Sequence, residues 1–226
     1  MLRTLPLVAV LALVGCDPAQ PSTDVNQDRV FTRYELRRDR DATRARASFR
    51  FGGPSGTQLV LDGSADVSFE GSRLRLVELP ANLTFYEREL DRDARAGRFV
   101  YEDADGVAFE NGAEVPPSID LADGVEISND QDTDVAFTGP PVRDGETVTL
   151  SLFRGGSDAR LAVAEQTRAG ATSVTVPVAS LRGAAPGDVT LALSRSRTRP
   201  AAEAPGSGGE VVEVYEAPLR TGRIVD

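Results

Sequence analysis

From Val30 onward, apolar and polar residues alternate with a period of two, and the spacing typical of an α-helix is nearly absent. Residues 43–51 (TRARASFRF) show this best, because alanine and phenylalanine alternate with arginine and serine. Successive side chains of a strand point to opposite faces, so the pattern predicts a strand with one buried face and one face in water. The same reasoning predicts further strands over 30–36, 58–61, 65–69, 73–77, 83–86, 98–103, 107–110, 147–153, 159–165, 172–178, 188–195 and 211–215. Shorter alternating segments lie around 125–127, 135–137 and 224–225.

Glycine-containing dipeptides divide these strands. Glu70-Gly71 and Asp105-Gly106 each lie between two alternating segments, which is typical of a hairpin turn. Asn111-Gly112 is expected to interrupt the chain. Short strands separated by glycine and proline are typical of a β-sandwich, so we predict an all-β protein.

Two segments depart from the alternation. Residues 87–97 (ERELDRDARAG) are polar and fit either a helical turn or a long loop between sheets. Residues 179–186 fit a helical turn between two strands.

The strands fall into two sets, which predicts two tandem β-sandwich modules over residues 29–119 and 120–226. The second set resembles an immunoglobulin-like module in pattern alone, because the chain lacks the buried tryptophan and paired cysteines of antibody domains. Residues 200–209 (PAAEAPGSGG) read as a flexible segment, but too few residues follow for a third domain. We therefore expect a mobile loop within the second module.

The start of the chain has the features of a signal peptide. Residues 5–14 (LPLVAVLALV) are apolar and follow Arg3. This run fits the roughly 7–15 residues of a signal-peptide core and is shorter than the ~20 residues that cross a membrane. It ends at Leu13-Val14-Gly15-Cys16, and Cys16 is the only cysteine in the chain.

Residues 13–16 resemble a lipobox, the sequence at which bacterial lipoproteins are acylated and cleaved. The resemblance implies that residues 1–15 are a lipoprotein signal peptide, that cleavage falls between Gly15 and Cys16, and that the Cys16 sulfur carries lipid such as palmitate. Each buried CH₂ of an acyl chain contributes about 0.8 kcal/mol, so the chains would hold the protein on a membrane of the cell envelope. An ordinary secretory signal with an incidental cysteine is the alternative.

The residues after Cys16 bear on location. Asp17 is similar to an inner-membrane retention signal of enteric bacteria, but other phyla read this position differently. Both the inner and the outer membrane therefore stay open, with the protein facing the periplasm or the cell surface. Residues 16–28 are polar and contain two prolines, which predicts a flexible tether between the anchor and the folded part.

Composition excludes several kinds of chemistry. The chain has 35 acidic and 25 basic residues, and it contains neither lysine nor histidine. The net charge of −10 disfavours nucleic acid as a main partner. Without histidine or lysine, catalysis by Ser-His-Asp, Cys-His, Ser-Lys or a Schiff base is excluded, as are histidine-ligated metals.

Two charged clusters are candidate binding sites. Asp130, Asp132 and Asp134 stand at alternate positions near the junction of the modules. Calcium takes roughly 6–8 oxygen ligands, so these carboxylates are candidate calcium ligands, and calcium is the one cofactor that the sequence suggests. The pattern is similar to EF-hand loops and cadherin linkers but has Val135 in place of the glycine and no closing glutamate. A solvated acidic loop is the alternative.

The second cluster is basic. Arg44, Arg46 and Arg50 are candidates for binding an anion, because the planar guanidinium matches phosphate or carboxylate. The alternative is that these arginines lie on the water face of a strand and pair with neighbouring carboxylates. The cluster as a whole comprises Arg37, Arg38, Arg40, Arg44, Arg46 and Arg50.

The chain resembles uncharacterised lipoproteins of Gram-negative bacteria that carry immunoglobulin-like domains. This resemblance implies a lipid-anchored envelope protein without catalytic activity, which serves a structural role or contacts an envelope protein or glycan. A calcium- or glycan-binding lipoprotein is the alternative. A carboxylate-based glycoside hydrolase is more remote, because the chain has no tryptophan to support a sugar ring.

Overall fold

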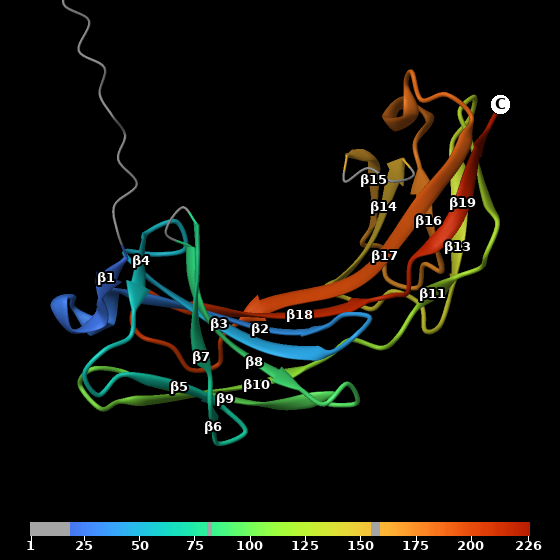
Figure 1. Cartoon of the computed structure of the whole chain (residues 1–226). Helices are drawn as coiled ribbons and strands as arrows, with labels where there is room; N and C mark the ends of the chain where they lie inside the picture. Colours follow the sequence, from blue (N-terminus) through green and yellow to red (C-terminus); the bar gives the residue numbers. More distant parts are fainter. Residues whose placement is uncertain (1–18, 81–82, 155–158) are drawn as a thin grey trace, which may run out of the picture.

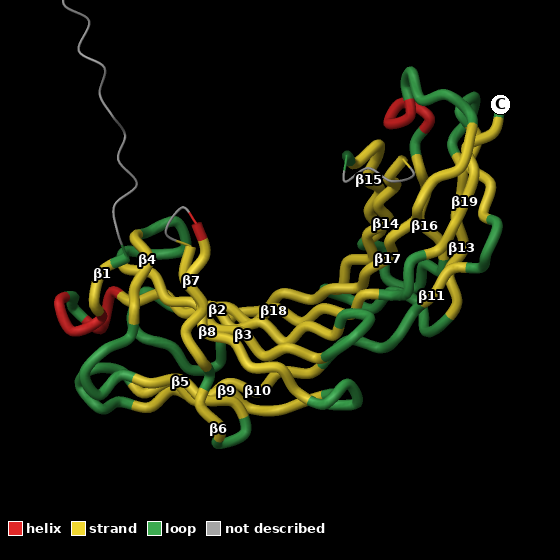
Figure 2. Tube along the Cα trace, viewed as in Figure 1, coloured by secondary structure: helices red, strands yellow, loops and turns green. Residues whose placement is uncertain are grey.

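The computed structural model describes residues 19–80, 83–154 and 159–226, in which nearly all regular structure is β-strand (Figures 1 and 2). The all-β prediction is confirmed. The 3-10 helices of this part are η1 (Ser22–Asp24), η2 (Gln27–Arg29) and η4 (Val178–Leu181). The strands are β1 (Gln20–Pro21), β2 (Val30–Arg38), β3 (Thr43–Phe51), β4 (Thr57–Val60), β5 (Asp66–Phe69), β6 (Ser72–Arg73), β7 (Arg75–Leu79), β8 (Leu83–Leu90), β9 (Ala96–Glu102), β10 (Ala108–Glu114), β11 (Asp120–Leu121), β12 (Val125–Ser128), β13 (Thr133–Thr138), β14 (Glu146–Arg154), β15 (Arg160–Gln166), β16 (Ser173–Val176), β17 (Gly187–Pro200), β18 (Gly209–Glu216) and β19 (Arg220–Val225).

One large sheet runs through the whole fold, in the order β1-β4-β3-β2-β18-β17-β14-β15. Two strands are long enough to pair with two neighbours along the same edge. β3 pairs with β4 near Phe51 and with β8 near Thr43, and β7 continues beyond β8. β17 pairs with β19 at its start and with β18 at its end, and β12 continues beyond β19.

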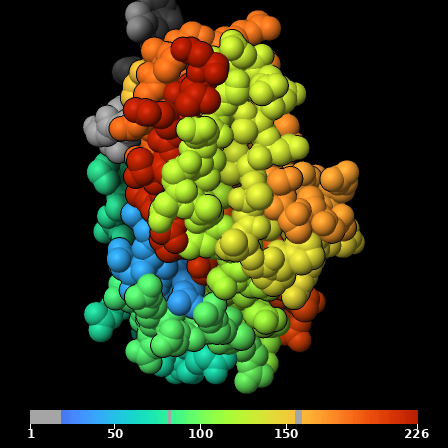
Figure 3. All heavy atoms as spheres, turned by 90° about the vertical axis from the view of Figure 1, so that its right-hand side faces the viewer, coloured from blue at the N-terminus to red at the C-terminus, as the bar shows by residue number. Residues whose placement is uncertain are grey.

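Two smaller sheets pack against the large sheet. The sheet β10-β9-β5-β6 encloses a first hydrophobic core, to which Tyr34, Phe49, Phe99 and Tyr101 contribute. The sheet β11-β13-β16 encloses a second core, to which Leu150, Leu152, Val174 and Leu191 contribute. The molecule therefore consists of two β-sandwiches that share one sheet. Figure 3 shows the C-terminal segment beside the chain that precedes β13, in agreement with the parallel pairing of β12 and β19.

Both small sheets cover the same face of the large sheet. Side chains two residues apart share a face of a strand, so Leu191, Leu193 and Arg195 of β17 point to the same side. Leu191 and Leu193 belong to the second core, while Arg195 stands opposite Tyr215 in the β17–β18 ladder. Tyr215 packs against both cores. None of the described strands forms a sheet over the opposite face of the large sheet, and Figure 1 shows that this face lies on the inside of the bend.

Charged side chains separate the two cores on the covered face. The alternation of β17 continues from Leu193 into Arg195, Arg197 and Arg199, so cations take the place of apolar residues there. Arg199 donates to the Gly112 carbonyl of β10 from this position. The apolar side chains of β17 thus stop between the sandwiches although the sheet is continuous, and Tyr215 of β18 packs against both cores.

Residues 19–29 are folded, although most of them belong to the segment where a tether was expected. Within the expected tether 16–28, β1 pairs in parallel with β4, and η1 and η2 follow. The carboxylate of Asp62 accepts hydrogen bonds from the Ser22 hydroxyl at 2.9 Å and from the Thr23 backbone N–H at 2.9 Å. Buried Gln27 donates to the Ser22 carbonyl at 2.7 Å. These polar side chains bind the first sandwich instead of water, which the composition of the segment did not indicate.

Three further local expectations meet different outcomes. Asp105-Gly106 forms the expected hairpin turn between β9 and β10, with Gly106 at a φ of +80°. The hairpin at Glu70-Gly71 pairs only through β6, because the chain then passes to the large sheet as β7. Asn111-Gly112 does not interrupt the chain but lies within β10.

The loop after β17 contacts the first sandwich. Asn111 donates to the Glu203 carbonyl at 2.7 Å and accepts from the Ala202 N–H at 2.8 Å. These bonds hold the loop against β10. The mobility expected for residues 200–209 stays a prediction, and so does the module boundary between residues 119 and 120.

In the described ranges no helix is both long and apolar enough to cross a membrane.

Candidate functional site

The uncovered side of the large sheet is the main candidate surface, and we call it the open face. Its side chains are those that point away from both cores. Most are polar or charged, because the period-two pattern places them in water. From β3 across to β14 they include Arg44, Arg46, Ser48, Arg33, Glu35, Arg37, Glu210, Glu216, Ser194, Ser196, Thr149, Ser151 and Phe153.

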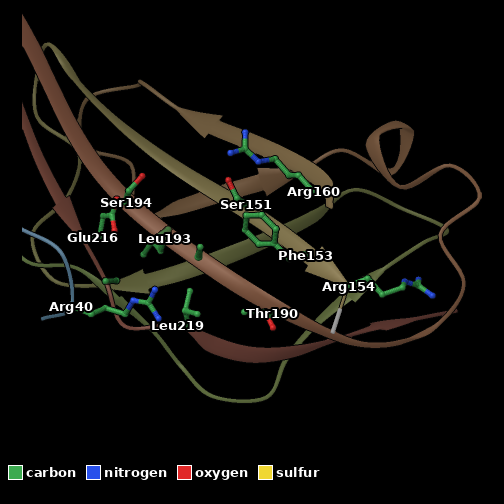
Figure 4. A pocket seen from close by; sticks show the side chains of 12 residues that line it. Arg40, Ser151, Phe153, Arg154, Arg160, Thr190, Leu193, Ser194, Glu216 and Leu219 are labelled. Carbon is green, nitrogen blue, oxygen red and sulfur yellow. The ribbon is translucent and has the colours of Figure 1, made fainter. Parts of the chain in front are cut away.

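A cavity of about 650 Å³ lies in the open face where the two sandwiches meet. We call it the arginine pocket. Its floor comes from β14 and β17, while Arg160 enters from β15 and Arg40 from the turn between β2 and β3 (Figure 4). The pocket therefore combines residues from both sandwiches. It is lined among others by Arg40, Ser151, Phe153, Arg160, Thr190 and Ser194.

The arginines of this pocket differ in their partners. Arg154 donates to the Ala185 carbonyl at 2.7 Å, and Figure 4 shows its side chain directed away from Arg40 and Arg160. The side chains of Arg40 and Arg160 are exposed, and neither guanidinium makes a hydrogen bond or ion pair within the described residues. The Arg160 guanidinium carbon lies 5.8 Å from the centre of the Phe153 ring. One available cation therefore lies beside an aromatic ring, and Figure 4 shows the other, Arg40, across the pocket.

The other polar groups of the pocket also favour an anion. Among the described residues that line it, Glu216 is the one carboxylate, and this group already pairs with Arg37. The hydroxyls of Ser151, Thr190 and Ser194 make no hydrogen bond within the described part of the chain. Hydroxyl groups donate and accept, so they suit a ligand that offers both functions.

The predicted anion-binding arginines of β3 lie on the open face but are engaged. Arg44 pairs with Asp39 and, at 3.4 Å, with Glu89. Arg46 donates from Nε to Glu87 at 3.0 Å and stacks on Phe85, with 4.2 Å from its guanidinium carbon to the ring centre.

Arg50 donates to the Pro54 carbonyl at 3.0 Å. Arg44 and Arg46 correspond to the alternative of ion pairs on a solvated strand, whereas Arg50 has a backbone carbonyl as its partner. Anion binding by Arg44, Arg46 and Arg50 stays a prediction.

The predicted calcium ligands lie around β13. Asp132 accepts from the Val178 N–H at 2.9 Å and Asp134 from the Thr175 hydroxyl at 2.5 Å, while Asp130 is exposed. Among the described residues no group of three or more acidic side chains is arranged to hold a metal ion.

The acidic stretch of the sequence extends upstream to Asp120, and this acid has an ion-pair partner. Asp120 binds Arg220 from β19, and this hydrogen bond holds the pKa of the Asp120 carboxyl below its usual value. The cluster is therefore distributed over several elements in the fold.

Cys16 and Gly15, the predicted acylation and cleavage residues, lie outside the described residues. Sequence reasoning placed Arg40 in the basic cluster but did not associate it with Phe153 or Arg160. No local signal could have done so, because these residues are more than a hundred positions apart in the chain.

Comparisons with known proteins give little beyond this geometry. No family model matches the chain, and no curated protein is significantly similar to it. Among solved structures, the adhesin InvE of Yersinia pseudotuberculosis is similar at 11% identity, with a TM-score of 0.22. The match covers 84% of this chain and 59% of that adhesin chain. A TM-score at this level does not establish a common fold, so the similarity carries no functional conclusion.

Proposed function

We propose that this protein is a lipid-anchored interaction module of the cell envelope, which binds a partner through its open face and has no catalytic activity. One observation carries the proposal: both small sheets pack on the same face of the large sheet, so the other face is left uncovered across both sandwiches. A protein that only separated two points would not need an uncovered face that contains a cavity.

The proposed anchor rests on the sequence from Leu13 to Cys16. β1, the first strand that the structure describes, lies at one end of the bent sheet (Figure 1), so an anchor before it would leave the open face accessible. Replacing Cys16 by serine should release the protein from sedimented membranes. Unchanged sedimentation together with an unmodified thiol in mass spectrometry would refute acylation.

A binding role without turnover is supported by the groups that the pocket offers. Glycoside hydrolysis requires two carboxylates about 5–10 Å apart. Within the described part of its lining, the arginine pocket offers Glu216 alone, and that carboxylate pairs with Arg37. Guanidinium and hydroxyl groups bind and orient an anion, but neither group is a good general base at neutral pH.

Site-specific photo-crosslinking in intact cells tests which face is used. A photoreactive residue at Ser48 or Thr149 lies on the open face, whereas one at Glu102 or Ala136 lies on the outer side of a small sheet. We expect discrete crosslinked products from the first pair only. Products from the second pair at equal yield, or none from the first, would refute the proposal.

A further inference from the structure

Two cations in the arginine pocket differ from the arginines of β2 and β3 on the open face, which have partners. Arg33 pairs with Glu210, Arg37 with Glu35 and Arg46 with Glu87. Arg40 and Arg160 have no such partner among the described residues, although the chain as a whole carries ten more negative than positive charges. An anion is repelled by most of this protein but attracted locally to these two guanidinium groups.

The remaining walls of the pocket indicate what the anion is attached to. The Phe153 ring lies beside Arg160, and the ring edge and Leu219 supply a small apolar surface (Figure 4). Ser151, Thr190 and Ser194 add hydroxyls without protein partners in the described ranges. A lipid chain would need a deep apolar cavity, whereas an open pocket with one ring and several hydroxyls suits a small polar ring.

We infer that the arginine pocket binds an acidic saccharide, with one carboxylate at Arg160, a second carboxylate at Arg40 across the pocket and a ring against Phe153. Arginine binds a carboxylate through two parallel hydrogen bonds, which an ester or an alcohol cannot reproduce. The ring hydroxyls would meet Ser151 and Thr190 on the floor. The volume of about 650 Å³ accommodates a small saccharide. This inference rests on the proposed function, because the pocket is part of the open face.

Calorimetry on the full-length protein in detergent tests the inference with short oligogalacturonate as the probe. Its methyl ester has the same rings without the charge, and acetate has the charge without the ring. We expect oligogalacturonate to bind, and both the ester and acetate to bind at least about tenfold more weakly. Raising the salt concentration should weaken the binding of oligogalacturonate, because the pocket is open to solvent.

Matched variants locate the site. Arg40→Gln and Arg160→Gln should each weaken oligogalacturonate binding by about tenfold or more, because each removes one charged partner. Phe153→Leu should weaken the acid and the ester alike. Arg168→Gln removes the same charge from an exposed residue outside the pocket, and it should leave the affinity unchanged. Circular dichroism of each variant confirms that the fold is retained.

The possible results separate this inference from the proposed function. Three results would each refute the inference that the pocket binds an acidic saccharide. They are absence of oligogalacturonate binding, equal binding of the ester, and unchanged affinity in folded Arg40→Gln and Arg160→Gln variants. Crosslinking from the open face would in those cases leave the proposed function in place. Binding that is lost in both arginine variants but kept in Arg168→Gln would support the inference.

Discussion

The Nε atom of Arg197 lies 2.6 Å from a carboxylate oxygen of Glu213, directly across the β17–β18 ladder. The side chain of Glu213 is only 1% exposed, and its other oxygen accepts the Glu114 N–H of β10 at 3.0 Å. One carboxylate thus joins the large sheet to the first small sheet. It does so on the covered face, between the two hydrophobic cores.

Replacing Glu213 by glutamine should destabilise the protein. The amide keeps the shape but removes the charge that Arg197 and Arg199 share, and a hydrogen bond to a charged group contributes about 1.5–3 kcal/mol. We expect the free energy of unfolding in urea to fall by about 1–3 kcal/mol. Glu210→Gln on the same strand is the control, because its pair with Arg33 is exposed and should contribute at most about 1 kcal/mol. Equal losses for the two variants would contradict the assignment.

The buried pair of Arg195 and Glu146 should behave differently from a surface pair. Their side chains are 0% and 3% exposed, with 3.8 Å between Nε and Oε2. Glu146→Gln leaves the cation without its counter-charge and should cost about 3–5 kcal/mol. Arg195→Met in that background should recover most of the loss, because an apolar residue of similar size needs no partner. The two single variants and the double variant, compared by urea denaturation, measure this coupling; simple additivity would refute it.

The loop after β17 should come loose when Asn111 is changed. The Asn111 side chain makes hydrogen bonds to the backbone of Ala202 and Glu203, and the residue is 1% exposed. Asn111→Ala removes these partners and should cost about 1–3 kcal/mol. Limited proteolysis should then cut within residues 201–208 faster than in the unmodified protein. Glu102→Ala on the neighbouring β9 is exposed and should leave the cleavage rate unchanged.

The contact of the N-terminal segment with Asp62 should depend on pH. The Thr23 N–H, with the hydroxyls of Thr23 and Ser22, holds the pKa of the Asp62 carboxyl below its ordinary value. A lowered folded pKa means that the ionised carboxyl contributes stability above the ordinary pKa of about 4, and that this contribution is lost as the pH falls through the folded pKa. The difference in melting temperature between the unmodified protein and Asp62→Asn should therefore shrink in acid. A difference that grows on acidification would show the opposite linkage.

Local alternation accounts for most of the strand predictions. β3 covers the expected residues 43–51, and the hairpin at Asp105-Gly106 is confirmed, because both depend only on near neighbours in the chain. For residues 87–97 the sequence alone fits either a helical turn or a loop. There β8 runs to Leu90, since Glu87 and Glu89 pair with the arginines of β3. The alternating charges of β8 therefore indicate a strand only when the arginines of the neighbouring β3 are known.

By itself, the sequence determined that the protein is all-β, which side chains of each strand share a face, and which catalytic groups are absent. The tertiary structure alone decided that both small sheets cover one face, that Arg195 and Glu213 lie between two cores, and that Arg40 reaches the pocket of Arg160. The reason is that a strand's alternation follows from its own backbone geometry, whereas pairing between distant segments depends on the free energy of the whole chain. Residues such as Leu36 and Glu213 become neighbours only through that pairing.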